Sequence, residues 1–202
     1  MRRVLIVRHG QSEWNAQRRW QGWIDIPLTS AGEAQATARG RTLADAGVAV
    51  PVVFSSDLSR ASRTAELLAA EIGAQVVTDE RFRERHGGEW QGHTAEEIDE
   101  RWPGMRERWR RREAHPPGAE HDDEVLARFD DALVAVAAAT ADGHDAIIVT
   151  HGGGLRLVAD RGGADGGRVA ENVGGHWFLY EEGTLTASEP LPPLAADGAA
   201  VE

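Results

Sequence analysis

The stretch RVLIVRHG, residues 3–10, is an apolar run that ends in arginine, histidine and glycine. Apolar residues without polar alternation indicate a strand that is buried on both faces, as in a parallel sheet. Similar runs recur as PVVF at 51–54 and AIIVT at 146–150, each bounded by turn-forming or polar residues. We therefore expect strands at 3–7, 51–54 and 146–150 in one sheet.

Helical patterns fill the segments between these runs. A helix is predicted over residues 30–47. It begins at a capping box formed by Ser30 and Glu33 and stops at Gly47. The second segment repeats apolar residues at spacings of three and four before Gly73, namely Leu58, Ala61, Ala65, Leu68 and Ile72. A third helix is expected over about 123–140, with acidic residues in its first turn. Strands that alternate with helices predict an α/β fold with right-handed crossovers and helices on both faces of the sheet.

Composition narrows the classes of partner. The chain has 202 residues, a formal charge of −11 and no cysteine. An acidic protein repels nucleic acid and anionic membranes, so we expect neither partner and favour a small, locally captured ligand. The absence of cysteine suits a reducing compartment, and no apolar stretch approaches a membrane span or a signal peptide. These features predict a cytoplasmic protein.

One domain is expected over residues 1–188, because its length and apolar content suffice for a single core. Residues 189–202, EPLPPLAADGAAVE, lack periodicity and are rich in proline, alanine and glycine. This segment is predicted to be a flexible C-terminal tail.

Two of the predicted strands end in histidine followed by glycine, at His9 and His151. Ligands of such sheets bind outside the carboxyl ends of the strands, where a histidine would meet them and a glycine would let backbone approach closely. Arg60 and Arg63 fall in the first turns of the helix that follows the middle strand, beside amide groups that favour an anion. Because the arginine fork suits phosphate oxygens, this edge is predicted to bind phosphate.

Other features have plainer explanations. The arginine run at 106–113 is expected to be a solvated helix face, with a rim of the ligand site as the alternative. HDDE at 121–124 could suggest a metal cluster, but adjacent acids at a helix start are explained by capping and the helix dipole. We therefore predict no metal and no cofactor. Four tryptophans are expected to be pocket walls or core: Trp14, Trp20, Trp23 and Trp90.

Several separated motifs, in this order, resemble the histidine phosphatase superfamily, also called the phosphoglycerate mutase-like family. They are RHGQSEWN with GWIDIPLTSAG, SSDLSRASRTAE, RERHGGEWQG and VTHGGGLR. The resemblance covers about residues 3–180 and is specific, because so many ordered motifs rarely occur together by chance. It implies a three-layer α/β/α sandwich with a mostly parallel central sheet, which agrees with the pattern of strands and helices.

The resemblance also implies a set of site residues. His9 resembles the nucleophile that becomes phosphohistidine, and Glu84 resembles the proton donor. Arg8, Arg60 and His151 resemble groups that hold the phosphate. The positions expected to contact phosphate or substrate are Asn15, Gln21, Gly22 and Gly152. The expected partner is a small phosphorylated substrate or inorganic phosphate, and a homodimer is the default assembly.

Three functions are compatible with this resemblance. GWIDIPL, ERH and WRRRE resemble cofactor-dependent phosphoglycerate mutases, whereas GEWQG, HPPGAEHDDEVLARF and HGGGLR resemble phosphatases. The mutase pattern expects tyrosine at Gly87, lysine at Ala95 and an additional segment after the prolines, and these departures favour a phosphomonoester hydrolase. A third alternative is an inactive domain that only binds phosphorylated ligands.

Overall fold

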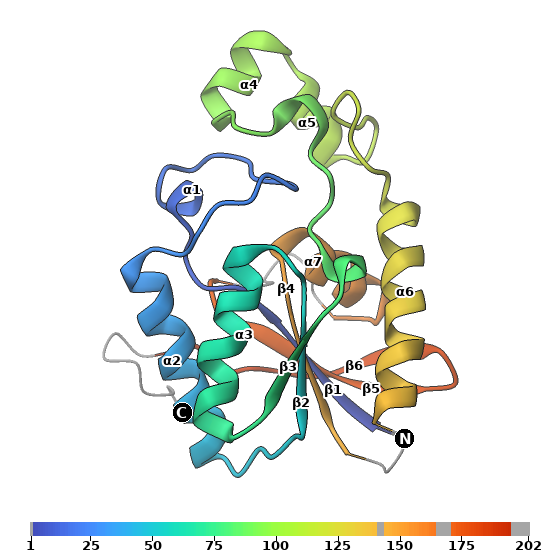
Figure 1. Cartoon of the computed structure of the whole chain (residues 1–202). Coiled ribbons are helices and arrows are strands. Elements are labelled where there is room, and N and C mark those ends of the chain that lie inside the picture. The colour runs from blue at the N-terminus through green and yellow to red at the C-terminus, as the bar shows by residue number, and fades with distance from the viewer. Residues whose placement is uncertain (1, 141–143, 165–170, 195–202) are drawn as a thin grey trace.

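A computed structural model of the chain describes residues 2–140, 144–164 and 171–194, and its centre is a six-stranded sheet (Figure 1). The strand order is β3-β2-β4-β1-β5-β6. The strands are β1 Arg2–Arg8, β2 Val52–Ser55, β3 Gln75–Thr78, β4 Ala146–Thr150, β5 Gly175–Glu181 and β6 Thr184–Pro190. Strands β3, β2, β4 and β1 are parallel, and β5 and β6 add an antiparallel edge. The predicted α/β class and mostly parallel sheet are thereby confirmed.

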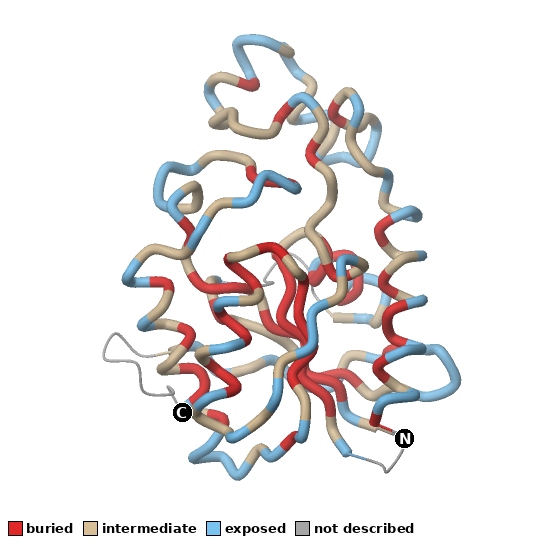
Figure 2. Tube along the Cα trace, in the orientation of Figure 1, coloured by how far each residue is buried: buried red, intermediate tan, exposed pale blue. Residues whose placement is uncertain are grey.

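Helices cover both faces of this sheet. They are α1 Glu13–Ala16, α2 Ser30–Asp45, α3 Ser59–Ile72, α4 Ala95–Arg101, α5 Met105–Arg110, α6 Asp122–Ala139 and α7 Gly152–Arg161. In β1, Leu5 and Val7 face the core cluster that contains α2 and α3, whereas Val4 and Ile6 face the cluster that contains α6 and α7. This alternation follows from the two-residue period of a strand, and it produces the three layers. Figure 2 shows that the central strands are the most continuously buried part of the chain.

Beyond the carboxyl ends of the parallel strands, α4 and α5 form a smaller lobe that stands apart from the sandwich (Figure 1). Short 3₁₀ helices at Glu80–Phe82 and Gly88–Trp90 lie on the segment that leads from β3 to this lobe. The chain returns from α5 to the sandwich through residues 111–121 and enters α6. The lobe therefore lies over the edge of the sheet where the candidate residues were expected.

The predicted strands agree with β1, β2 and β4 to within one residue at each end, and the three predicted helices are present. The prediction of a capping box at Ser30 and Glu33 was wrong. Thr29 is the N-cap of α2, with extended backbone, and its hydroxyl oxygen accepts a hydrogen bond from the Gly32 amide at 3.0 Å. Ser30 is already in the helix, so its side chain cannot serve as the cap. Gly73 ends α3 in the left-handed region, as its position in the sequence predicted.

The start of the predicted tail at 189 lies inside β6, which continues to Pro190. Beyond it, the Pro192 carbonyl accepts a 2.8 Å hydrogen bond from the largely buried Arg39. Residues 195–202 of the predicted tail lie outside the described residues. Within the described part of the chain, no helix has the length and apolar character needed to cross a membrane.

Ile148 provides a test of the packing, because it lies in the fully buried strand β4 between β1 and β2. Replacing Ile148 by alanine should lower the free energy of unfolding by about 2–5 kcal/mol, since it removes buried methyl groups and leaves a cavity. Val134→Ala on α6 is the control, because Val134 is 60% exposed and its change should stay within about 0.5 kcal/mol. Urea denaturation followed by circular dichroism measures both, and similar midpoints for the two variants would contradict the assignment of β4 to the core.

Candidate active site

The site begins with the register between β1 and β4. These parallel neighbours pair Arg8 with Thr150, so the next residues, His9 and His151, leave the sheet side by side. Their ring centroids lie 5.1 Å apart, with an interplanar angle of 63°. Two histidines 142 positions apart in the sequence thus form one cluster at the carboxyl edge of the sheet.

His9 is buried, with 2% of its surface exposed, and its Nδ1 lies 2.6 Å from the Gly10 carbonyl oxygen. A carbonyl can only accept a hydrogen bond, so the proton sits on Nδ1 and the lone pair of the neutral ring is at Nε2. Burial first, and then the charges of Arg60 and Arg8, hold the pKa of His9 well below its ordinary value. A backbone carbonyl thus fixes the tautomer of His9, and the neutral ring is suited to nucleophilic attack.

His151 is completely buried at the N-terminus of α7. Neither of its ring nitrogens has a hydrogen-bond partner among the described residues. Burial, followed by the charges of Arg60 and His9, lowers its pKa well below the usual histidine value. A buried ring with an unsatisfied N–H gains from an anionic oxygen placed next to it.

Arg60 lies at the first turn of α3, and only 1% of it is exposed. Its Nη2 and Nη1 donate to the carbonyls of Gly22 and Ile24, at 2.7 Å and 2.9 Å. Burial lowers the pKa of Arg60 to about 10, so the guanidinium stays charged at neutral pH. Burial also lowers the pKa of Arg8, an effect that Glu84 partly offsets. The two cations and two histidines therefore surround one small volume.

Arg63 does not belong to this cluster, although its position in the helix suggested that it would. Its guanidinium pairs with Glu33 at 2.8 Å and with Glu66 at 3.1 Å, and its side chain is 47% exposed. One turn of α3 separates it from Arg60, and it lies on the outer side of the helix. The expected anion site thus uses one of the two arginines.

Glu84 supplies the carboxylate of the site. Its Oε2 accepts from the Gly153 amide at 3.0 Å, and its Oε1 accepts from the Arg85 amide at 2.8 Å. A Cβ on Gly153 would lie 2.3 Å from Oε1, so this close approach requires glycine. Arg128, which the sequence did not single out, donates to the carbonyls of Arg81, Arg83 and Glu84 and pairs with Glu120 at 2.7 Å.

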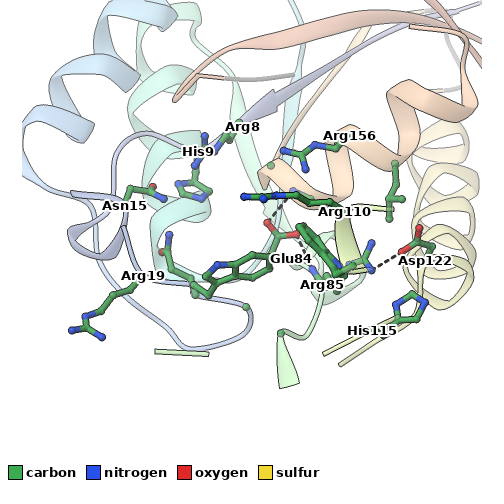
Figure 3. A pocket seen from close by; sticks show the side chains of 18 of the residues that line it. Arg8, His9, Asn15, Arg19, Glu84, Arg85, Arg110, His115, Asp122 and Arg156 are labelled. Atoms are coloured by element: carbon green, nitrogen blue, oxygen red, sulfur yellow. Dashed lines mark hydrogen bonds and ion pairs between the residues drawn. The ribbon is translucent and has the colours of Figure 1, made fainter. Parts of the chain in front are cut away.

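These groups open into a cavity of about 550 Å³. In Figure 3 the side chains of His9, Glu84 and Arg110 point into the same hollow from different elements. The predicted site residues that line it are Arg8, His9, Asn15, Gln21, Gly22, Arg60, Glu84 and Gly152. His151 is absent from this lining and contacts the site through its position beside His9. The structure thus brings these residues together, whereas Arg63 lies outside the site.

Asn15 and Gln21 are held by the loop that follows β1. Asn15 Oδ1 accepts from the Ser12 amide at 3.2 Å and from Asn172 Nδ2 at 3.3 Å. Gln21 Oε1 accepts from the Ser12 hydroxyl at 2.8 Å. Because these contacts use the carbonyl oxygens of the two side-chain amides, their NH₂ groups can donate to a ligand in the cavity.

Sequence reasoning missed much of the pocket's charge. Eight arginines line the cavity, namely Arg8, Arg18, Arg19, Arg60, Arg85, Arg110, Arg112 and Arg156, against the carboxylates of Glu84 and Asp122. Asp122 pairs with Arg85 at 2.5 Å. The surplus of cations makes the cavity a site for an anion, although the whole chain carries −11. The tertiary fold collects these arginines from separate elements, so no local motif indicated Arg18, Arg19, Arg85 or Arg156.

The arginine run at 106–113 serves both of the roles considered for it. Arg110 and Arg112 line the cavity, whereas Arg106 pairs with Asp99 and Arg111 pairs with Glu107 on the surface. Arg106 and Arg110 lie in α5, whereas Arg112 follows the helix with a φ of 59°, so the run changes direction and supplies both the rim and a solvated face.

Of the four tryptophans expected to be pocket wall or core, Trp20 and Trp90 fit the prediction, whereas the half-buried Trp14 and the 39% exposed Trp23 do not line the cavity. Trp20 and Trp109 line the cavity, and both pack edge-on against Trp90, which is fully buried. The acids at 122–124 occupy the first turn of α6, where the Glu124 carboxylate accepts from the His121 amide at 2.7 Å, so capping explains them. Across the described residues, no group of three or more histidine, aspartate or glutamate side chains is placed to hold a metal ion.

Residues 4–164 match the model of the histidine phosphatase superfamily, branch 1, and the chain belongs to this family. It is 38% identical over 163 residues to a 2,3-bisphosphoglycerate-dependent phosphoglycerate mutase from Methylocella silvestris, covering 78% of this chain and 79% of the relative. It is 44% identical over 110 residues to a glucosyl-3-phosphoglycerate phosphatase from Mycolicibacterium vanbaalenii, covering 54% and 48%.

Solved structures show the same fold. A mycobacterial glucosyl-3-phosphoglycerate phosphatase in complex with VO3 superimposes with a TM-score of 0.81 and 28% identity, over 94% of this chain and 97% of that one. A protein from Thermus thermophilus superimposes with a TM-score of 0.72 and 32% identity, over 93% and 98%. The relatives therefore include proteins named as mutases and proteins named as phosphatases.

The lowered pKa values of His9 and His151 predict a specific response to acid. Both rings should stay neutral in the folded protein as the pH falls through 6.5, their ordinary value. The unfolded chain takes up protons there and the folded chain does not, so the free energy of unfolding should fall below about pH 6.5. Histidine-selective nitrogen NMR measures the titration, and His151→Gln should remove part of the stability loss. A His9 or His151 ring that titrates near 6.5 in the folded protein would contradict this site.

Proposed function

We propose that the chain is a phosphomonoester hydrolase that acts on a small phosphorylated metabolite through a phosphohistidine on His9. The observation that carries this proposal is the buried His9 ring, neutral and fixed by Gly10, beside the charged Arg8 and Arg60. A nucleophile needs an available lone pair, and a phosphoryl group in transfer needs cations around its equatorial oxygens. The site supplies both without a metal ligand set among the described residues.

In the first step, the Nε2 lone pair of His9 attacks phosphorus while the bond from phosphorus to the ester oxygen breaks. Arg8, Arg60 and the N–H of His151 donate to the phosphoryl oxygens, where negative charge is spread in the transition state. Protonated Glu84 gives its proton to the departing alkoxide, which leaves as an alcohol. The products of this step are phosphohistidine, the alcohol and the Glu84 carboxylate.

In the second step, a water molecule attacks the phosphorus of phosphohistidine. The Glu84 carboxylate takes a proton from this water as the P–N bond breaks. Inorganic phosphate forms, the electron pair of the broken bond returns to Nε2, and His9 is neutral again. The two amides that bind the Glu84 carboxylate, those of Gly153 and Arg85, keep it in place for both steps.

The structure of the lobe above the site supports water as the acceptor of the phosphoryl group. Ala95 is the first residue of α4 and does not line the cavity, and Gly87, which does, has no side chain. The link between α5 and α6 takes only residues 111–121, of which Arg112 and His115 line the cavity, so little chain is available to cover its mouth. A mutase must keep water away from phosphohistidine while its intermediate reorients, and these features favour access of water.

The second candidate is a cofactor-dependent phosphoglycerate mutase. It is favoured by Arg110, which lines the cavity as a possible cation for a second phosphate, and by the 38% identity to a protein named as a mutase. A purely phosphate-binding domain is less consistent with the site, because the proposed nucleophile, proton donor and phosphate ligands are all present. A homodimer and a cytoplasmic location stay predictions.

The proposal is tested by whether the phosphoryl group is transferred to water or to a second hydroxyl group. We expect the protein to release inorganic phosphate from a phosphomonoester such as 3-phosphoglycerate and to form little 2-phosphoglycerate. Addition of 2,3-bisphosphoglycerate should not raise the rate, because a hydrolase does not need to be primed. Phosphorus NMR follows all the species in one sample.

The His9→Ala variant is the control for contaminating phosphatases and should release no phosphate above background. Isomerisation that outruns phosphate release, and that requires priming by the bisphosphate, would establish the mutase instead. Ligand binding without either reaction, across several phosphomonoesters, would establish the binding domain.

A further inference from the structure

Trp23 is a large apolar residue that stays 39% exposed beside the cavity without lining it. Its indole Nε1 donates a 2.6 Å hydrogen bond to the main-chain carbonyl of Glu84. The two residues are 61 positions apart in the sequence, so this contact joins the loop after α1 to the segment that carries the proposed proton donor. Nothing in the reaction steps above uses this contact.

The rest of the Trp23 side chain touches the residues around Glu84. The Arg83 guanidinium lies over its ring, 5.1 Å from the centroid, and the His86 ring meets it edge-on at 5.3 Å. Arg83 is anchored in turn by an ion pair with Asp57. The indole therefore contacts Arg83 before Glu84 and His86 after it, and it also binds the Glu84 carbonyl.

The main chain of Trp23 is fixed by the phosphate site. Arg60 donates to the carbonyls on either side of Trp23, those of Gly22 and Ile24. The Trp23 amide donates to Gln91 Oε1 at 2.7 Å. Gly22 adopts a φ of +54°, and a Cβ there would lie 2.7 Å from the main-chain nitrogen of Gly87, so the loop requires glycine for this path.

We propose that Trp23 is a positioning residue that ties the proton donor Glu84 to the phosphate-binding Arg60. This inference rests on the proposed function, because it assumes that Glu84 protonates the leaving oxygen. The contacts run from Arg60 through two carbonyls to the Trp23 main chain, and from the indole N–H to Glu84. They place the carboxyl group relative to the bound phosphate, and proton transfer depends steeply on that placement.

Removing the indole N–H should leave the fold intact. The Glu84 carbonyl also accepts from Arg128 Nη2 at 3.0 Å, so it keeps a partner when the indole donor is lost. The ring is exposed, and phenylalanine retains an aromatic face for Arg83 and His86. Trp23→Phe therefore isolates the hydrogen bond to Glu84.

The test compares two substrates with different needs for an acid. Trp23→Phe should lower kcat about tenfold for an alkyl phosphate and less than about twofold for 4-nitrophenyl phosphate, whose leaving group needs little protonation. Inhibition by inorganic phosphate should not change, because Arg8 and Arg60 remain in place. Thermal unfolding of each variant verifies that the fold is retained.

Trp102→Phe is the matched control. Trp102 also meets a histidine edge-on, His93 at 5.5 Å, and lies under an arginine, Arg101 at 4.9 Å, but it does not line the cavity. This variant should leave kcat unchanged for both the alkyl phosphate and 4-nitrophenyl phosphate. It reports any general effect of replacing an indole on the lobe.

A double variant separates positioning from a structural role. If Trp23 acts through Glu84, Trp23→Phe should cause no further loss on the alkyl phosphate once Glu84→Gln is present. Equal losses on the two substrates, or losses that multiply fully with those of Glu84→Gln, would overturn the role of Trp23. If Glu84→Gln by itself affects both substrates equally, the failure lies in the proposed proton donor, and the role of Trp23 falls with it.

Discussion

The parallel pairing of β1 with β4 is the constraint on which the rest of the site depends. Its register places Arg8 opposite Thr150, and the chain then turns out of the sheet at His9 and His151 together. The turn at His9 is fixed by the Gly10 amide, which donates to Thr64 on α3, and Gly10 has room only for a hydrogen because the Gly32 carbonyl of α2 would lie 2.4 Å from a Cβ. A shift of one residue in this register would send one of the two histidines to the opposite face and separate the pair.

Burial determines the chemistry of this cluster. Arg60 and the two histidines are almost completely enclosed, and the nearby positive charges oppose a proton on either ring. An anionic phosphoryl group would compensate the buried charges of Arg8 and Arg60, which explains how a chain with a formal charge of −11 could bind an anion. The local arrangement of charge, rather than the total, decides what this cavity binds.

The fold class and the centre of the site were predictable because they rest on local signals. The continuous apolar strands, the helix that ends at Gly73, and the histidine–glycine pairs at strand ends each lie within a few residues of sequence. The strand β3 could not be predicted, because it is short, mostly exposed and paired on one side only. The hydrogen bonds of Trp23 and Arg128 to Glu84 could not be predicted either, since they join segments 61 and 44 positions apart.

Covalent labelling of His9 tests the central claim most directly. Rapid mixing with a phosphorus-32-labelled substrate, followed by a quench in base, should trap an acid-labile phosphoryl group on the peptide that contains His9. The label should vanish in His9→Ala and persist in His93→Ala, whose ring does not line the cavity. Label that remains in His9→Ala, or turnover by the wild-type protein without any trapped phosphohistidine, would contradict the account.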